Sequence, residues 1–318
     1  MSKRIDWIDD VKFVGIVSVV YFHVIDGLHY TYNFNGWSYF IPTTFTKGIA
    51  LSAFFFSSGI FAKKWLQKEN KYRKKILTLL VPYFIWSIIY TVINVMLNKN
   101  VNHPTKLSAI LTIPFYPQWH FWFIYYLFFC FLLFVIMQKF SLNNQIVFCF
   151  IGCLLGAFLT TKGIKLWILD NFFQYFVFFL LGSLYSKIEL KVKSINIIFL
   201  LFSLICSYSL YVYMFIQNKI SIVYLLSFVT SITAIIALIR LFKQCKYIPL
   251  FSFIGRRSMP IYLLHVFFTS FTRIILLKFA INSIVINISL GLVFGVNLPI
   301  FVYWVTQRLK INKLLFGM

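Results

Sequence analysis

The first apolar segment of the chain carries a row of ionisable side chains on one helical face. Lys12 and His23 are 11 residues apart, which is about 20° past three full turns of an α-helix, with a rise of about 16 Å. Asp9 lies three residues before Lys12, and Asp26 lies three residues after His23, so both are near that face. Imidazole titrates near neutral pH, which makes His23 a candidate general base with Lys12 and Asp9 as catalytic partners. A histidine that is only hydrogen-bonded in the core is the alternative.

A second polar row lies near the C-terminal end of the chain. Its members are spaced by 4, 3, 4 and 3 residues, which keeps them on one face of a helix: Ser258, Tyr262, His265, Thr269 and Thr272. Tyr and Thr rows often only pack or bond to the backbone. Because the row includes a histidine, we predict that Tyr262 and His265 are catalytic.

A third polar group occupies residues 118–123 (QWHFWF) at the start of an apolar segment. Tryptophans at such a position are typical of an interfacial belt. His120 and Trp122 are therefore either membrane anchors or part of a site, and both are candidate substrate-binding residues.

The composition shows which elements must position these residues. The chain has 318 residues, of which 61% are hydrophobic and only 12% are charged, against about 25% in soluble domains. These values exclude a soluble globule and a disordered chain. We predict an all-α polytopic membrane bundle that forms a single domain over 1–318. It has about ten apolar helices, at 9–27, 43–62, 76–97, 119–138, 145–161, 167–186, 195–216, 220–241, 258–277 and 283–305.

The basic residues set the orientation of this bundle. The net charge is +23, but the cations form short clusters between apolar segments rather than a nucleic-acid-binding surface. With the N-terminus inside, the inner segments carry 22 Lys and Arg and the outer segments carry 8. This asymmetry predicts that both termini are cytoplasmic, with no nucleic-acid partner. Acidic residues at 6, 9 and 10 and the lack of an A-x-A site favour retention of the first helix.

Several kinds of chemistry are excluded by what the sequence lacks. It contains no G-x-S-x-G, Walker, G-x-G-x-x-G or H-E-x-x-H motif, which argues against hydrolase, NTPase, Rossmann and zinc-protease chemistry. Five cysteines are too few for a disulfide scaffold, and no His or Cys pair completes a metal set, so we expect no metal site.

Five short motifs in order resemble acyltransferase family three, and in particular its fucose-acetylase-like branch without an extra extracytoplasmic domain. The motifs are 5–12 (IDWIDDVK) with His23, 54–59 (FFFSSG), 71–75 followed by 80–83 (LVPY), 120–123 (HFWF), and 255–265 (GRRSMPIYLLH). The resemblance covers nearly the whole chain. Two positions depart from the family pattern. Lys12 stands where many members have Arg, which removes a bidentate donor, and Ser57 stands where Ile is usual.

The resemblance implies transfer of an acyl group, usually acetyl from cytoplasmic acetyl-CoA, to a sugar hydroxyl of a surface glycan or its lipid-linked precursor. It implies a multi-pass protein of the bacterial plasma membrane, with His23 as general base or acyl carrier. The basic inner segments are candidates for binding the CoA phosphates through Arg73, Lys74, Lys75, Arg256, Arg257 and Ser258. The aromatic 28–39 segment is a candidate sugar surface. The acceptor candidates are Asp26, Tyr32, Trp37, His120 and Trp122.

A transporter or flippase for a glycan or its lipid carrier is the main alternative, because a polar row along a helix could line a path. We find no inverted repeat and no pair of helices broken by Gly or Pro, which such a transporter would be expected to have. The third alternative, a structural or sensory membrane protein, leaves the rows at His23 and His265 unexplained. The sequence leaves open whether the chain forms a homo-oligomer.

Overall fold

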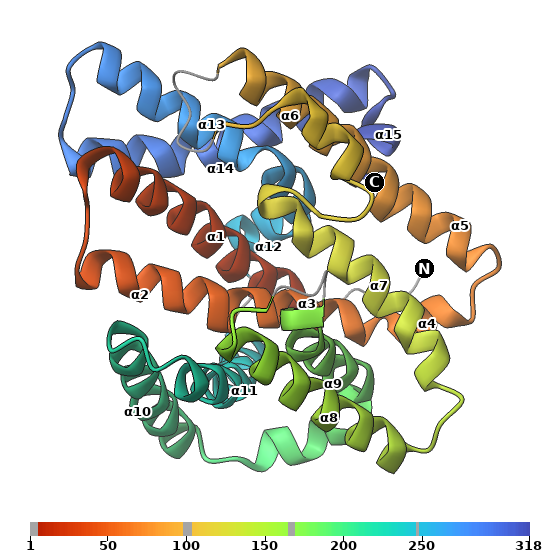
Figure 1. Cartoon of the computed structure of the whole chain (residues 1–318). Coiled ribbons are helices and arrows are strands. Elements are labelled where there is room, and N and C mark those ends of the chain that lie inside the picture. The colour runs from red at the N-terminus through yellow and green to blue at the C-terminus, as the bar shows by residue number, and fades with distance from the viewer. Residues whose placement is uncertain (1–5, 98–103, 165–168, 246–247) are drawn as a thin grey trace. The chain divides into compact units, whose positions relative to one another are not determined.

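All the regular secondary structure in the described part of the protein is helical. A computed structural model describes residues 6–97, 104–164, 169–245 and 248–318. Within these ranges 85% of the chain is helix and there is no strand, which confirms the predicted all-α class. Long helices and short connections follow one another along this part of the chain (Figure 1).

The first half of the chain contains the longest uninterrupted helix and several helices that are joined end to end. The elements are α1 (Asp6–Tyr32), α2 (Trp37–Phe45), η1 (Thr46–Ala50), α3 (Leu51–Ile60), α4 (Ala62–Leu66), α5 (Lys71–Lys75), η2 (Ile76–Leu80), α6 (Val81–Met96), η4 (Leu107–Thr112), η5 (Trp119–Phe121) and α7 (Trp122–Met137).

The second half is built mainly of long helices with short connections. The elements are α8 (Leu142–Thr161), α9 (Leu169–Ser194), α10 (Ile197–Ile216), α11 (Ile220–Gln244), α12 (Pro249–Arg256), α13 (Ser258–Lys278), α14 (Ile284–Arg308) and α15 (Asn312–Phe316).

The chain forms two compact units. Unit 1 comprises residues 1–18, 40–68 and 130–256, and unit 2 comprises residues 19–39, 69–129 and 257–318. Both α1 and α7 contribute residues to each unit. The two units are described separately below.

In unit 1, α3 packs closely on α9 through a pair of glycines. A Cβ on Gly59 would lie 1.9 Å from the carbonyl oxygen of Phe179, and a Cβ on Gly182 would lie 2.0 Å from that of Phe56. Neither glycine can gain a side chain without moving a backbone, so these positions hold the two helices together. Around this pair, α8 packs on α9, and α10 packs on α11.

In unit 2, α13 and α14 lie side by side (Figure 1). Two glycines of α14 allow close packing against neighbouring side chains. A Cβ on Gly291 would lie 2.8 Å from Val24, and one on Gly295 would lie 2.7 Å from Thr269 and 2.8 Å from Val20. The second half of α1 and helix α13, which carry predicted site histidines, therefore pack against the same helix.

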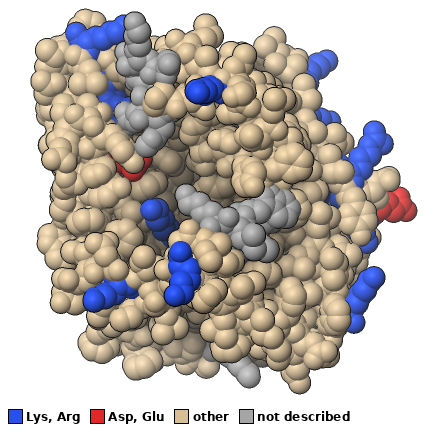
Figure 2. Space-filling view, in the orientation of Figure 1, with Lys and Arg blue, Asp and Glu red and all other residues tan. Residues whose placement is uncertain are grey.

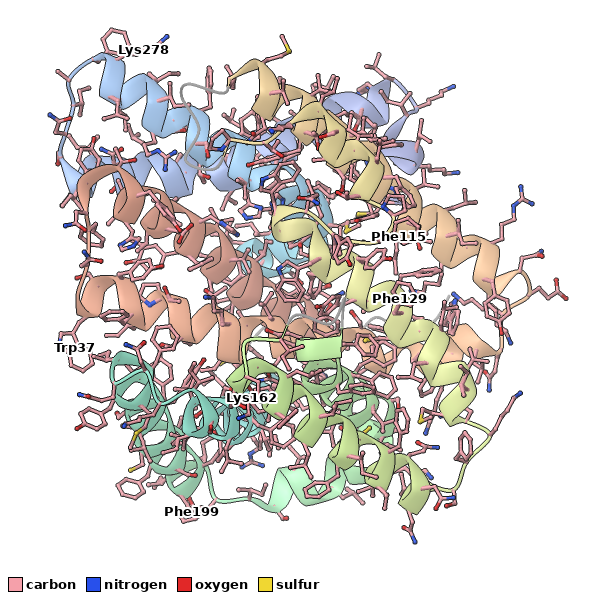
Figure 3. All side chains as sticks on the ribbon, viewed as in Figure 1. Trp37, Phe115, Phe129, Lys162, Phe199 and Lys278 are labelled. Carbon is pink, nitrogen blue, oxygen red and sulfur yellow. The ribbon has the colours of Figure 1, made fainter. Side chains whose placement is uncertain are left out.

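Eight helical stretches of the described residues are long and apolar enough to cross a membrane, so the chain is a multi-pass membrane protein. Much of the apolar surface lies on the outside of the helices. On α10, for example, Ile198, Phe199, Phe202 and Ile205 are 64–75% exposed, and Phe199 points outward in Figure 3. Most of the face in Figure 2 is uncharged. Such a surface is suited to contact with lipid chains.

The stretch from Trp37 to Ile60 is not among those eight, because its hydroxyl groups and Lys47 lower its mean hydropathy. Its polar side chains are satisfied by backbone carbonyls. Thr44 donates to Phe40 at 2.9 Å, and Ser52 donates to Gly48 at 2.9 Å. Leu169–Ser194, which ends in a charged segment, is also not among them. The count of about ten spans and the cytoplasmic termini remain predictions.

Candidate active site

Three histidines from three separate segments meet in unit 2. His23 of α1 and His265 of α13 have ring centroids 4.9 Å apart, and His120 of η5 lies 5.8 Å from His23 and 5.1 Å from His265. His120 and His265 are buried, whereas His23 is half-buried. The structure thus brings together three histidines that the sequence placed in separate polar groups. The most accessible of the three lies on α1.

The hydrogen bonds of His265 fix which of its nitrogens carries the proton. Its Nδ1 lies 3.0 Å from the carbonyl oxygen of Ile261 and 2.8 Å from that of Tyr262. A carbonyl oxygen only accepts, so Nδ1 must be the protonated nitrogen of the neutral ring. The lone pair is then on Nε2, which is buried and has no hydrogen-bond partner in the described part of the chain. The backbone of α13 therefore holds a basic nitrogen ready within the histidine cluster.

His120 is held by an unusual backbone turn and by a tyrosine. Trp119, just before it, has a φ of 47°, in the left-handed region that bulky residues rarely adopt. This residue turns the chain from the extended Gln118 into η5. The Tyr262 hydroxyl donates to the carbonyl oxygen of His120 and so joins α13 to η5. Tyr262 was predicted to be catalytic, and this bond instead favours a positioning role.

Arg273 lies beside the cluster and is only 8% exposed. It lines, together with His23, Thr269 and Asn287, a cavity of about 10 Å³, which is room for one water-sized group. Its Nη1 passes so close to α1 that a Cβ on Gly27 would lie 2.2 Å away. The guanidinium can lie there only because residue 27 has no side chain.

A carboxylate accompanies this buried cation. Asp26 is near enough to Arg273 to interact with it electrostatically, as are Tyr32 and Tyr90. The Tyr39 hydroxyl donates to Oδ1 of Asp26 at 3.3 Å. Asp26, a predicted acceptor residue, is therefore part of a polar network beside His23.

Arg273 was not singled out in the sequence, where it was counted only as an outer basic residue. Two signals could have identified it. It lies inside the predicted 258–277 span, where a charge is costly, and it is four residues after Thr269, which is in the His265 row.

The predicted residues at the start of α1 belong to unit 1. Arg256 Nε lies 3.6 Å from Oδ2 of Asp9, and Gly255 packs so closely that a Cβ there would be 1.9 Å from the carbonyl oxygen of Asp9. Arg256, predicted to bind CoA phosphates, thus has a carboxylate partner. Lys12 Nζ lies 5.9 Å from the ring centroid of Phe61.

The other predicted basic residues lie in unit 2. Arg73 and Lys74 are exposed on α5 and Lys75 is half-buried, as are Arg257 and Ser258 at the start of α13. The three basic residues of α5 and the two residues at the start of α13 thus belong to separate helices.

The predicted aromatic acceptor residues are spread over unit 2. The Tyr32 hydroxyl donates to Asn282 at 3.4 Å. Trp37 is 60% exposed and points away from the helices (Figure 3). The half-buried Trp122 packs on Tyr126, with ring centroids 5.1 Å apart. Of the predicted acceptor residues, His120 is therefore part of the histidine cluster, and Asp26 and Tyr32 lie near Arg273 beside it.

Within the described residues, no group of three or more His, Cys, Asp or Glu side chains is arranged to hold a metal ion. The three histidines of the cluster are among the residues that do not form such a group. The cluster consists of three imidazoles, with the Arg273 guanidinium and the Asp26 carboxylate beside them.

Comparison with known proteins identifies the family. The profile of the acyltransferase domain of acyltransferase family three matches residues 5–306, which is nearly the whole chain. No curated protein and no solved structure matches the chain significantly. The match includes all five motifs and the segments that carry His23, His120, His265 and Arg273. The chain therefore belongs to acyltransferase family three and is a membrane acyltransferase.

Proposed function

We propose that the protein is an O-acetyltransferase of the bacterial plasma membrane. It moves an acetyl group from cytoplasmic acetyl-CoA to a hydroxyl of a surface polysaccharide or of its lipid-linked precursor. The family supports acyl transfer, and the donor, the acceptor and the membrane are our proposal.

The observation that carries this proposal is the histidine cluster beside a water-sized cavity. Transfer to a hydroxyl requires a base that removes its proton as the oxygen attacks the thioester. His23 supplies a half-buried imidazole, the most accessible of the three, and lines the cavity, which has room for one hydroxyl group. His265 presents an unprotonated Nε2 within the same cluster.

In the proposed reaction, His23 accepts the proton of the acceptor hydroxyl. The oxygen attacks the thioester carbonyl, the carbon–sulfur bond breaks, and the CoA thiolate takes the proton back from His23. One ester is formed and one thioester is consumed, with no net change in protons. His265 Nε2 can accept the N–H of His23 and so orient that ring.

Arg273 and Asp26 bind the acceptor in this proposal. A guanidinium and a carboxylate together offer donors and acceptors to the hydroxyls of a sugar ring. Both belong to the unit that holds His23, and Arg273 lines the same cavity. They would hold one hydroxyl against the imidazole, which is the orientation that raises the rate of such a transfer.

The proposal is tested in cells that lack the protein and are complemented with wild type or with His23→Ala. Base-labile acetyl groups on the surface polysaccharide are measured by NMR, and the amount of exported polysaccharide is measured in the same samples. We expect normal export with acetyl groups restored only by wild type. Loss of export with normal acetylation of the intracellular glycan would show a transporter instead.

A further inference from the structure

Unit 1 contains a cavity of about 540 Å³ that the reaction above does not use. It is lined by residues of α1, α3, α4, α9 and α11, by Phe61 between α3 and α4, and by Gln67 directly after α4. Binding sites for small organic molecules are typically about 300–1,000 Å³. The cavity is thus large enough to hold a substantial part of a cofactor-sized molecule.

Three ammonium groups line this cavity. Lys243 forms an ion pair with Glu189, which fixes its position. Lys63 and Lys64 have no ion-pair partner in the described residues, although both line the cavity. Burial lowers the pKa of Lys63, and the neighbouring Lys187 lowers it further. A bound anion would balance these charges.

Three aromatic side chains, Trp7, Phe61 and Tyr185, also line the cavity. Lys243 Nζ lies 5.4 Å from the ring centroid of Trp7 and 5.1 Å from that of Tyr185, so one ammonium covers both rings. Phe61 also lines the cavity and is 40% exposed, which leaves a ring face for stacking. Lys12, 5.9 Å from the Phe61 centroid, adds a fourth ammonium near this ring.

The lining segments are ones that the charge pattern predicted to be on the same side of the membrane. Residues 1–12, 63–75, 187–194 and 240–257 were all predicted to be cytoplasmic. Within unit 1, side chains of Trp7, Lys63, Glu189 and Lys243, one from each of these segments, line a single cavity. In the predicted orientation, these segments place the cavity on the side of the membrane that contains acetyl-CoA.

We propose that this cavity binds the adenosine 3′,5′-bisphosphate part of the acetyl donor. The proposal rests on the proposed function, because it assigns a place to the donor of that reaction. Adenine would stack on Phe61, and the phosphates would meet Lys63 and Lys64. Gln67 and Ser183, which also line the cavity, offer hydrogen bonds to the edge of the base. A phospholipid headgroup could use the lysines, but it has no ring to stack on Phe61.

The test is direct binding of adenosine 3′,5′-bisphosphate, which has no thioester and no acetyl group. Full-length protein is placed in phosphatidylcholine nanodiscs, and the Kd is measured by calorimetry for wild type and variants. We expect Lys63→Ala/Lys64→Ala to raise the Kd about tenfold and Phe61→Leu to raise it about threefold. Lys63→Arg/Lys64→Arg, which keeps both charges, should bind within about twofold of wild type.

The matched control is Lys139→Ala/Lys313→Ala, which removes two exposed lysines of the predicted inner side outside the cavity. It should leave the Kd within about twofold. An equal loss in both double-alanine variants would overturn the proposal, since it would show only general attraction by positive charge. The proposal would also be overturned if the wild-type cavity bound phosphatidylglycerol but did not bind the bisphosphate.

Acetyl transfer from labelled acetyl-CoA, measured on the same preparations, separates this proposal from the proposed function. If Lys63→Ala/Lys64→Ala binds the bisphosphate as well as wild type does, and the wild-type enzyme transfers acetyl groups, the proposed binding site is wrong. The proposed O-acetyltransferase function is then still supported. Weakened binding in that variant, together with a wild type that transfers no acetyl group, supports the cavity and rejects the function.

Discussion

The cavity at His23 and the cavity at Lys63 differ in size by a factor of about 50, and their walls are built differently. The first is a water-sized space between imidazole and guanidinium groups, and a glycine is required for Arg273 to reach it. The second is a broad space with several ammonium groups and rings. A narrow site depends on each atom being in place, whereas a broad one distributes its binding over many weak contacts. Single substitutions should therefore have much larger effects at the first cavity.

The largest effect is expected from His23→Ala. Loss of a general base lowers the rate about 10²–10⁴-fold. The matched control is Ser18→Ala on the same helix, because the Ser18 hydroxyl donates to the Val14 carbonyl at 2.6 Å and is not part of the cluster. Turnover is measured in nanodiscs with equal amounts of each protein. Similar activity in the two variants would remove His23 from the chemistry.

Arg273→Lys should reduce kcat/KM for the acceptor about 10–100-fold. A charge-assisted hydrogen bond contributes about 1.5–3 kcal/mol, and lysine cannot reproduce the forked guanidinium. Gly27→Ala should have a similar effect, because its Cβ would displace Nη1 of Arg273. Gly291→Ala, whose Cβ meets Val24 instead, is the control for helix packing. If Gly27→Ala and Gly291→Ala lower activity equally, the position of Arg273 is not what matters.

Tyr262→Phe should lower kcat by about two- to tenfold with little change in either KM. The variant loses the hydrogen bond to the His120 carbonyl, which contributes about 0.5–1.5 kcal/mol, while its ring still packs. Tyr303→Phe on α14 is the control, since that ring packs on Phe316 away from the cluster. A loss as large as that of His23→Ala would restore Tyr262 as a catalytic group.

The smallest effects are expected at exposed predicted residues. Arg256→Gln and Trp37→Ala should each raise one KM by about two- to fivefold, for the donor and the acceptor respectively. Arg256 forms a long, partly exposed ion pair with Asp9, and such pairs contribute about 0–1 kcal/mol. Both KM values are measured with donor and acceptor varied independently. An increase in the same KM for both variants would contradict entry of the two substrates from opposite sides.

These two regions also show what could be predicted from the sequence. Helical periodicity identified the rows of His23 and His265, because residues 3 and 4 apart share a face. It could not show that His120 joins them, since that depends on a left-handed Trp119 and a hydrogen bond from a distant tyrosine. Arg273 was missed because its burial depends on a glycine of another helix.

The cavity in unit 1 could not be predicted for a different reason. Charge counting assigned Lys63 and Lys243 to the same side of the membrane, but a topology rule has no information on which helix ends are neighbours. The family resemblance implied Arg256 as a phosphate ligand, and only the folded chain shows that Asp9 lies beside it. The all-α fold class could be predicted from the composition and from the lengths of the apolar segments alone, and this prediction is confirmed.

The left-handed Trp119 has a consequence for how this protein can be engineered. A non-glycine residue in that conformation typically costs about 1–3 kcal/mol, so Trp119→Gly would relieve backbone strain. The same change would remove the indole ring that packs on Tyr90 at 4.7 Å, and it would loosen the turn that aims His120. Selection for heat tolerance would therefore act on two opposing terms at this position, the relieved strain and the lost ring contact, whereas selection for activity would retain the tryptophan. Position 119 links the stability of this turn to the position of His120.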